Sequence, residues 1–270
     1  MAITDYNGVI AGIQWPRFFA KNVTGTMVAG RPQSLWALAG NPGAGSFNGT
    51  LAGVALSSTS AQVAGQVHFS DPVSGNTYLQ RLQASATIAG TLILADRLWH
   101  NGGFTITSNT SQTVNSVAFP DRDINGTTNG AGVLLGLEIS AAAGAAAPTI
   151  TVGYTNSDNT ASRTATNIFP TANSPSAGAF FPIGLQAGDI GVRSVQSLTL
   201  SVSWVSGTMN LVAYRPIVAL ELVGAQVPNA VDALTSGFPR LFDGSVPFFI
   251  FIPSTTTTSN ISGSVVWTQG

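Results

Sequence analysis

Short runs of alternating hydrophobic and polar residues, separated by turn-forming pairs, are the feature that most restricts how this chain can fold. In one such run Leu198, Leu200, Val202 and Trp204 alternate with Ser or Thr. A period of two over four to eight residues is typical of a strand buried on one face. Asn-Gly pairs, which favour the positive φ angles of tight hairpins, lie between many of the runs. Further runs of this kind are found at 65–71, 104–108, 209–223 and 263–270.

Evidence for helices is sparse. Segment 31–40 has an early Pro and a final Gly, which fits one or two helical turns. Segment 229–237 is similar, with Asn229 as a possible N-cap. The Ala-rich stretch at 140–148 is interrupted by Gly and ended by Pro, so we interpret it as a tight loop or the edge of a strand.

The pattern predicts an all-β protein, with a jelly-roll-like antiparallel β-sandwich as the first choice. We expect three parts along the chain. Residues 1–75 form an extended, Gly-rich arm with irregular β structure, residues 76–224 form the sandwich core, and residues 225–270 form a short β tail with strands at 246–253 and 261–269.

Charge is unusually scarce in this sequence. Charged residues make up 8% of the chain, against about 25% in typical proteins, and the formal net charge is -1. A surface covered by hydroxyl and amide groups suits a protein that works in an assembly, where contact would otherwise bury charge. The single lysine, Lys21, and nine scattered arginines form no basic patch, so we expect no nucleic-acid partner.

Other partners and compartments are also restricted. The chain has no Cys, hence no disulfide, thiol nucleophile or Cys-bound metal. Its first residues lack the basic and apolar regions of a signal peptide, and no uninterrupted apolar run is long enough to span a bilayer. We therefore expect synthesis in a cytoplasm, no membrane partner and no cofactor.

The stretch LADRLWHNGG, from Leu94 to Gly103, gathers the most chemistry-bearing residues. Asp96 and His100 would share a helix face, but the segment reads better as a strand, where four residues span about 13 Å. No G-x-S-x-G nucleophile motif accompanies them. We interpret the stretch as the end of a strand, with Trp99 as a core or interface anchor and Asp96 and Arg97 as a local polar pair.

A calcium-like pattern occurs at DRDINGTTNG, from Asp121 to Gly130. Asp121, Asp123, Asn125 and Gly126 match the start of an EF-hand loop, but Gly132 stands where the bidentate Glu belongs. The preferred interpretation is an Asx-rich surface turn. A looser calcium site using the turn from Asp121 to Asn125 stays open.

Other candidate sites are weaker. The Gly-rich segment 41–50 lacks the lysine of a phosphate loop, and His68 alternates with buried-type neighbours without metal-ligand spacing, so it should face solvent or an interface. A glycosidase-like pair of carboxylates assembled in space also stays open. The isolated acidic residues are Glu138, Asp158, Asp189, Glu221, Asp232 and Asp243.

Six stretches of the sequence lie at 91–116, 123–140, 153–166, 185–203, 209–217 and 236–254. They resemble virion proteins of tailed bacteriophages. They cover roughly Leu79 to Val218, with a further stretch near the end. The similarity is in the general character of the sequence and includes no catalytic motif. The resemblance implies a structural component of the particle, most like a capsid decoration (cement) protein, a group commonly built as jelly-roll trimers.

The leading hypothesis is thus a non-enzymatic virion protein on the capsid surface, which associates with itself as a homotrimer and with the major capsid protein. We expect no catalytic, cofactor-binding or metal-binding residues. The alternative is a receptor- or glycan-binding module of a tail or head fibre, with aromatics exposed for sugars; a polysaccharide-degrading enzyme is a third hypothesis. The aromatic anchors expected in self or neighbour contacts are Trp15, Phe18, Phe19, Trp36, Phe248, Phe249, Phe251 and Trp267.

Overall fold

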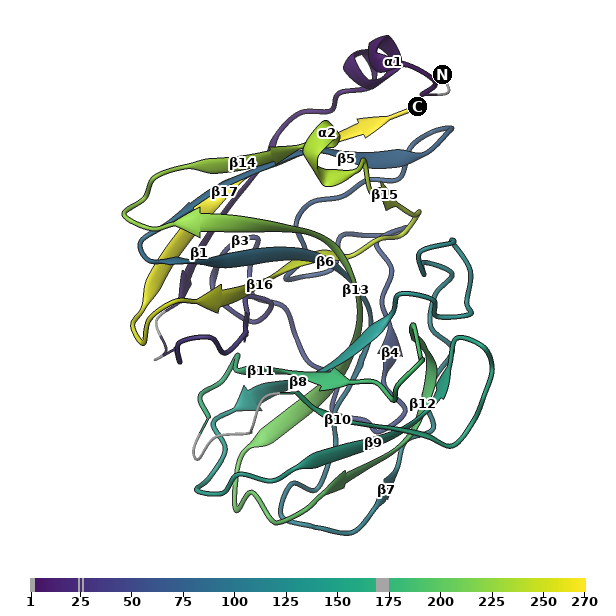
Figure 1. The fold of residues 1–270 in the computed structure, drawn as a ribbon, viewed down its shortest axis with the longest axis vertical. Helices are drawn as coiled ribbons and strands as arrows, with labels where there is room; N and C mark the ends of the chain where they lie inside the picture. Colours follow the sequence, from purple (N-terminus) through teal and green to yellow (C-terminus); the bar gives the residue numbers. More distant parts are fainter. Residues whose placement is uncertain (1–2, 24, 26, 169–174) are drawn as a thin grey trace.

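The computed structural model describes residues 3–23, 25, 27–168 and 175–270. The described chain is nearly all β, with two short helices and two curled antiparallel sheets in a sandwich-like arrangement (Figure 1). This confirms the predicted fold class. The elements are α1(Tyr6–Ala11), β1(Arg17–Val23), β2(Gln33–Ser34), β3(Gly40–Asn41), β4(Val54–Ala55), β5(Thr77–Ala86), β6(Ala89–Asn101), β7(Gln112–Thr113), β8(Leu134–Ala141), β9(Ile150–Asn156), β10(Arg163–Asn167), β11(Phe180–Gly184), β12(Val192–Leu200), β13(Thr208–Val223), β14(Asn229–Asp232), α2(Ala233–Ser236), β15(Arg240–Leu241), β16(Pro247–Pro253) and β17(Ser259–Gln269).

The smaller sheet has the order β14-β5-β17-β1-β3, with β15 also paired to β5. Its inner face is apolar because alternate residues of β5 and β17 point inward, as the period of two predicts. A register shift between Val266 and Trp267 leaves one extra residue, Gln80, on β5. This bulge keeps Leu79 and Leu82 on the same buried face.

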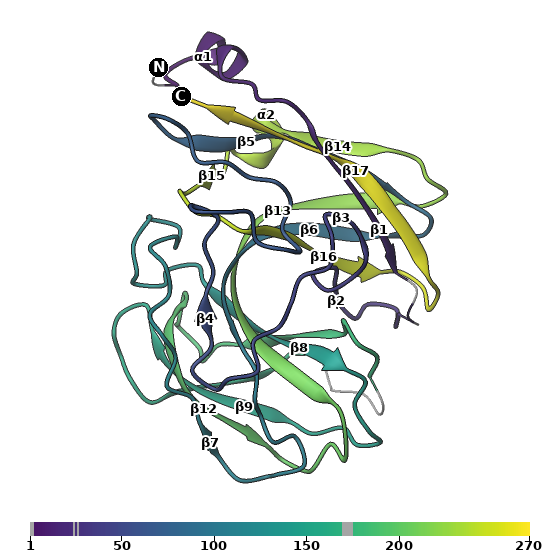
Figure 2. The same ribbon diagram turned by 180° about the vertical axis from the view of Figure 1, so that it is seen from behind.

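The larger sheet has the order β2-β16-β6-β13-β8-β11-β10-β9-β12-β7, with β4 paired to β6. Its long central strands β6 and β13 pair over twelve positions, from Leu211 opposite Asn101 to Val223 opposite Ala89. β13 runs through both halves of the molecule in both views (Figures 1 and 2). One half of the sheet faces the smaller sheet and the other half curls over its own core.

The core follows this division. One cluster lies between the two sheets and includes Leu82, Leu94 and Trp267, and another fills the curled half around Trp99 and Trp204. A third cluster, which includes Trp36 and Phe248, is built on the other side of the β6–β16 region. The predicted arm, residues 1–75, contributes strands to both sheets, and so does the predicted tail, residues 225–270. Both segments are therefore part of the two sheets.

Two alternating runs that predicted strands are not strands in the structure. In 65–71, Val67 and Phe69 are buried and His68 is exposed, as the alternation predicts. However, the Gln62 side-chain amide bonds both the N–H and the carbonyl of Phe69. In 104–108 the Gln112 amide likewise bonds both backbone groups of Thr105. A side-chain amide thus occupies the place of a neighbouring strand.

One helix prediction was wrong and the other was correct in part. Segment 31–40 contains the short strand β2 and a turn, because Gln33 and Ser34 pair with β16. Residues 229–232 form β14 on the edge of the smaller sheet, and α2 follows them. Asp232, and not Asn229, is the N-cap, accepting hydrogen bonds from the N–H groups of Leu234 and Thr235. Helix α1, which the sequence analysis did not predict, is capped by Asp5.

Candidate interaction surface

The chemistry-bearing stretch from Leu94 to Gly103 lies on β6 and its end, as predicted, and the side chains of Asp96, Arg97, Trp99 and His100 are all buried. The expected local pair of Asp96 and Arg97 was wrong, because adjacent residues on a strand point to opposite faces. Each instead pairs across the fold. Asp96 binds Arg122 at 2.9 Å, and Arg97 binds Glu138 at 2.8 Å.

These charges are enclosed on all sides. Asp96 also accepts hydrogen bonds from the Ser245 hydroxyl and the Val246 N–H. The Arg97 guanidinium lies 4.5 Å from the ring centre of Trp36 and 5.3 Å from that of Phe248, which are cation–π distances. Since none of these groups reaches solvent, they belong to the core of the fold and do not face a surface site.

His100 belongs to the same buried cluster. Its Nδ1 accepts hydrogen bonds from the Arg97 guanidinium. Burial, and to a lesser degree the Arg97 cation, lowers the pKa of His100 from 6.5 to about 3. The imidazole is therefore neutral near pH 7 and is held as an acceptor for Arg97.

The candidate calcium turn is held by its own backbone. The Asp123 carboxylate accepts hydrogen bonds from the N–H groups of Asn125, Thr127, Gly130 and Ala131, and from the Thr127 hydroxyl. N–H and O–H donors aimed at both oxygens take the positions that a cation would need. The Asx-turn interpretation is thus confirmed, although Asp123 itself is buried and not on the surface.

The remaining titratable candidates are His68 and the isolated acidic residues. His68 is exposed, and among residues 3–23, 25, 27–168 and 175–270 no group of three or more His, Cys, Asp or Glu side chains is placed to hold a metal. Of the isolated acids, Glu138 is paired in the core, Asp189 binds Arg163 at 2.9 Å, and Asp232 caps α2. Burial and the neighbouring Asp71 carboxylate raise the pKa of Asp243, but neither residue lines the hollows beside Phe18.

Six of the eight aromatic anchors expected from the sequence are buried within the chain itself, in the clusters described above. The other two, Trp15 and Phe18, expose 82% and 71% of their surface. Large aromatics this exposed are typical of residues that another molecule covers.

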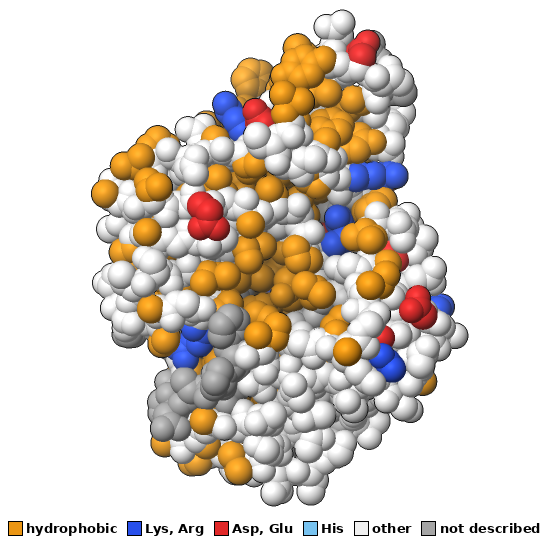
Figure 3. Space-filling model, viewed as in Figure 1, with side chains coloured by type: hydrophobic (Ala, Val, Ile, Leu, Met, Phe, Trp, Pro, Cys, Tyr) orange, Lys and Arg blue, Asp and Glu red, His pale blue; other side chains and the backbone are white. Residues whose placement is uncertain are grey.

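Trp15 follows a short helix that is itself apolar on its outer side. Tyr6 and Ile10, four residues apart on one face of α1, are both more than half exposed, and Ile13 is 45% exposed. We call residues 6–15 the N-terminal apolar segment. It projects at one end of the molecule (Figures 1 and 2), and hydrophobic side chains gather at that end in the space-filling view (Figure 3).

The segment is tied to β17 through backbone groups. The Gln14 N–H donates to the Trp267 carbonyl at 2.8 Å, and the Thr268 hydroxyl donates to the Val9 carbonyl at 2.7 Å. Apart from Gly8, the residues of α1 bury little. The segment is therefore fixed in place while its large side chains remain uncovered.

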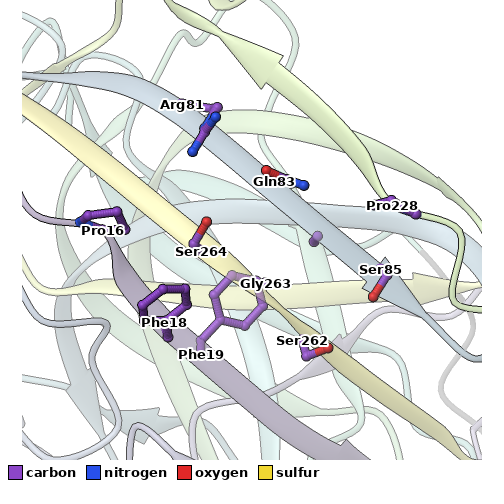
Figure 4. Close-up of a pocket in the computed structure, with 11 residues that line it drawn as sticks. Pro16, Phe18, Phe19, Arg81, Gln83, Ser85, Pro228, Ser262, Gly263 and Ser264 are labelled. Carbon is purple, nitrogen blue, oxygen red and sulfur yellow. The ribbon is translucent and has the colours of Figure 1, made fainter.

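Phe18, at the start of β1, separates two open hollows. One, of about 500 Å³, lies on the outer face of the smaller sheet between Phe18, β17 and β5 (Figure 4). The other, of about 560 Å³, lies between Phe18 and the loops 41–43 and 62–68. Both are of the size of small-molecule sites, about 300–1,000 Å³.

The exposed surface carries even less charge than the sequence indicates. Eight of the 21 charged side chains are buried, and much of the face in Figure 3 shows polar, uncharged atoms. Neither described helix has the length and hydropathy to cross a membrane. The buried charged residues are Lys21, Arg31, Asp96, Arg97, Arg122, Asp123, Glu138 and Arg215.

No family model and no curated protein matches the chain. Among solved structures, the VP2 subviral particle of infectious bursal disease virus is similar at 10% identity and a TM-score of 0.22, covering 96% of this chain and 82% of that chain. T=1 particles derived from the same virus give 9% identity and a TM-score of 0.17, covering 96% and 79%. TM-scores this low do not indicate a shared fold.

Proposed function

We propose that this protein is a structural component of a virus particle, which associates with further copies of itself and with the capsid surface. The most specific form of the proposal is a decoration protein that forms a homotrimer and binds the major capsid protein of a tailed bacteriophage. It acts by contact alone and has no enzymatic activity.

The observation that carries the proposal is the N-terminal apolar segment. Tyr6, Ile10, Ile13 and Trp15 are exposed within ten residues, although the same chain buries its other tryptophans almost completely. Transfer of such side chains from water into a contact is favourable by about 25 cal/mol per Å² of apolar surface. A tethered row of large apolar groups is therefore suited to bind a second subunit.

The scarcity of surface charge favours the same function. Bringing two surfaces together removes water from both, and the cost is largest for charged groups. With eight of its charged side chains already buried, the chain offers a surface of hydroxyl, amide and apolar groups. Copies with a formal net charge of -1 also repel one another very little.

Self-association is tested by light scattering on the purified full chain over a range of concentrations. We expect a trimer that dissociates on dilution, and we expect the double variant Ile10→Ser with Trp15→Ser to be largely monomeric. The control is Val73→Ser, which changes a fully exposed apolar residue in the 71–76 loop. A monomer at every concentration, or equal oligomerisation of both variants, would refute the proposal.

Capsid binding is tested by sedimentation of the chain with empty heads of the phage that encodes it, followed by electron microscopy of the decorated particles. We expect cosedimentation and density on the outer surface. Heads that sediment without the chain would exclude a decoration protein.

A further inference from the structure

The outer face of the smaller sheet carries a shallow groove of about 500 Å³ beside Phe18. Three strands supply its floor in register: Phe18 of β1 lies opposite Ser264 of β17, which lies opposite Gln83 of β5. In the next row Ser262 lies opposite Ser85. Figure 4 shows these side chains on neighbouring strands, with Arg81 at one end and Pro228 at the other.

The lining combines an aromatic wall with neutral hydrogen-bonding groups. Phe18 exposes 71% of its surface and borders three serines and an amide, each able both to donate and to accept hydrogen bonds. A sugar ring has complementary chemistry, because its C–H face packs on an aromatic ring and its hydroxyls bond to polar side chains. A lipid chain would leave the hydroxyl groups of such a floor unsatisfied.

Arg81 gives the groove its charge. It is the one charged residue among the eleven described residues that line the groove. Its Nε is buried yet has no hydrogen-bond partner, and Arg81 forms no ion pair within the described parts of the chain. Asp232, its register partner on β14, uses its carboxylate to cap α2. An unpaired guanidinium fork of this kind matches a carboxylate.

We propose that this groove binds a carbohydrate that carries carboxylate groups, such as a uronic-acid oligosaccharide. The carboxylate pairs with Arg81, the sugar ring packs against Phe18, and its hydroxyls bond to Gln83, Ser262 and Ser264. This site is additional to the self-association proposed above, since it does not use Tyr6, Ile10, Ile13 or Trp15.

The test is a titration of the full chain with oligogalacturonate, in which binding is measured by calorimetry and by NMR of the groove amides. A parallel titration with neutral maltohexaose gives the binding of an uncharged sugar for comparison. We expect saturable binding of oligogalacturonate and at least about tenfold weaker binding of maltohexaose, the loss typical of one charge-assisted contact. Arg81→Gln should weaken oligogalacturonate binding by about the same factor and bring the two sugars level. Phe18→Ser should weaken both sugars alike.

The control variant is Arg193→Gln, which removes a partly exposed arginine outside the groove and should leave binding unchanged. The oligomeric state of each variant, measured by light scattering, separates this proposal from the previous one. Absence of saturable binding by oligogalacturonate at millimolar concentration would overturn the proposal. Equal weakening by Arg193→Gln and Arg81→Gln, which indicates diffuse attraction by charge, would overturn it too.

Discussion

The guanidinium of Arg97 lies 2.8 Å from the carboxylate of Glu138, and neither side chain exposes any surface to solvent. The two residues come from β6 and β8, which are not neighbours in the sheet because β13 lies between them. The pair therefore ties together three adjacent strands. Burial lowers the pKa of Arg97, while the Glu138 charge acts in the opposite direction and keeps the ion pair in place.

We predict that Glu138→Gln destabilises the protein by about 3–5 kcal/mol, because it leaves the Arg97 cation buried without a counter-charge. The double variant Arg97→Met with Glu138→Leu should lose much less, since no charge remains in the core. Urea unfolding at neutral pH measures both. If the double variant is as unstable as Glu138→Gln, the ion pair itself stabilises the fold. The cost would then not come from leaving the Arg97 charge buried without a partner.

The lowered pKa of His100 leads us to predict that the folded protein loses stability in acid. Its pKa is about 3 in the folded chain, against 6.5 when unfolded, so between these values the unfolded chain binds more protons. Stability from this group is complete above pH 6.5 and falls as the pH drops toward 3, by about 1.4 kcal/mol per pH unit. His100→Asn keeps an acceptor for Arg97 and should flatten this slope in urea titrations. An unchanged slope would contradict the assignment.

The contribution of Asp189 to stability should change with pH in a lower range than that of His100. Hydrogen bonds from Arg163, and then from Tyr154 and Asn156, hold its pKa well below the ordinary 3.8. Its contribution is therefore present above pH 3.8 and is lost as the pH falls below that value. Asp189→Asn should lower the melting temperature at pH 7, and the difference from the wild type should shrink at pH 3 and below. Asp158→Asn, a change to an exposed acid on a nearby turn, is the control.

Lys21 anchors the loop after β2. Its Nζ donates to the carbonyls of Leu38 and Pro42 at 2.7 and 2.6 Å, and burial lowers the pKa of the amine to about 8. Lys21→Met should cost about 1–3 kcal/mol at pH 7, because the two carbonyls lose their donor. Hydrogen exchange should localise the loss to residues 38–43. Uniform acceleration of exchange across the fold would argue against a local anchor.

The Asp123 turn should not respond to calcium. Asp123→Ala removes an acceptor of five hydrogen bonds, and we expect a loss of roughly 2–4 kcal/mol. The wild-type melting temperature should be the same with calcium and with a chelator. A rise with calcium that disappears in the variant would restore the calcium alternative.

The sequence predicts the strands of this fold better than its contacts. Period-two alternation places β13 and β17 correctly, because one apolar face determines a strand wherever it pairs. The alternating run at 198–204 matches β12 only as far as Leu200, and β16 was predicted from the continuous apolar run at 246–253. Alternation alone does not show whether a neighbouring strand is present, so the roles of Gln62 and Gln112 were not foreseen. The partners of Asp96 and Arg97 were missed because ion pairs between distant strands leave no local pattern.

The candidate surface was foreseen in part. Trp15 and Phe18 were expected as contact residues, but six equally prominent aromatics turned out to be core. The sequence does not distinguish these cases, since an aromatic on an alternating strand suits a buried position as well as an interface. Arg81 and Gln83 were not singled out, because their juxtaposition with Phe18 depends on the order of strands in the smaller sheet.

The sixteen-residue strand β13 has a mechanical consequence. Because β13 contributes to both halves of the molecule, unfolding of either half also removes a strand from the other half. Calorimetry should therefore record a single heat-absorption peak. Tension applied to one half would pass along the covalent bonds of β13 into the other half, so the two halves would resist a pull as a single unit.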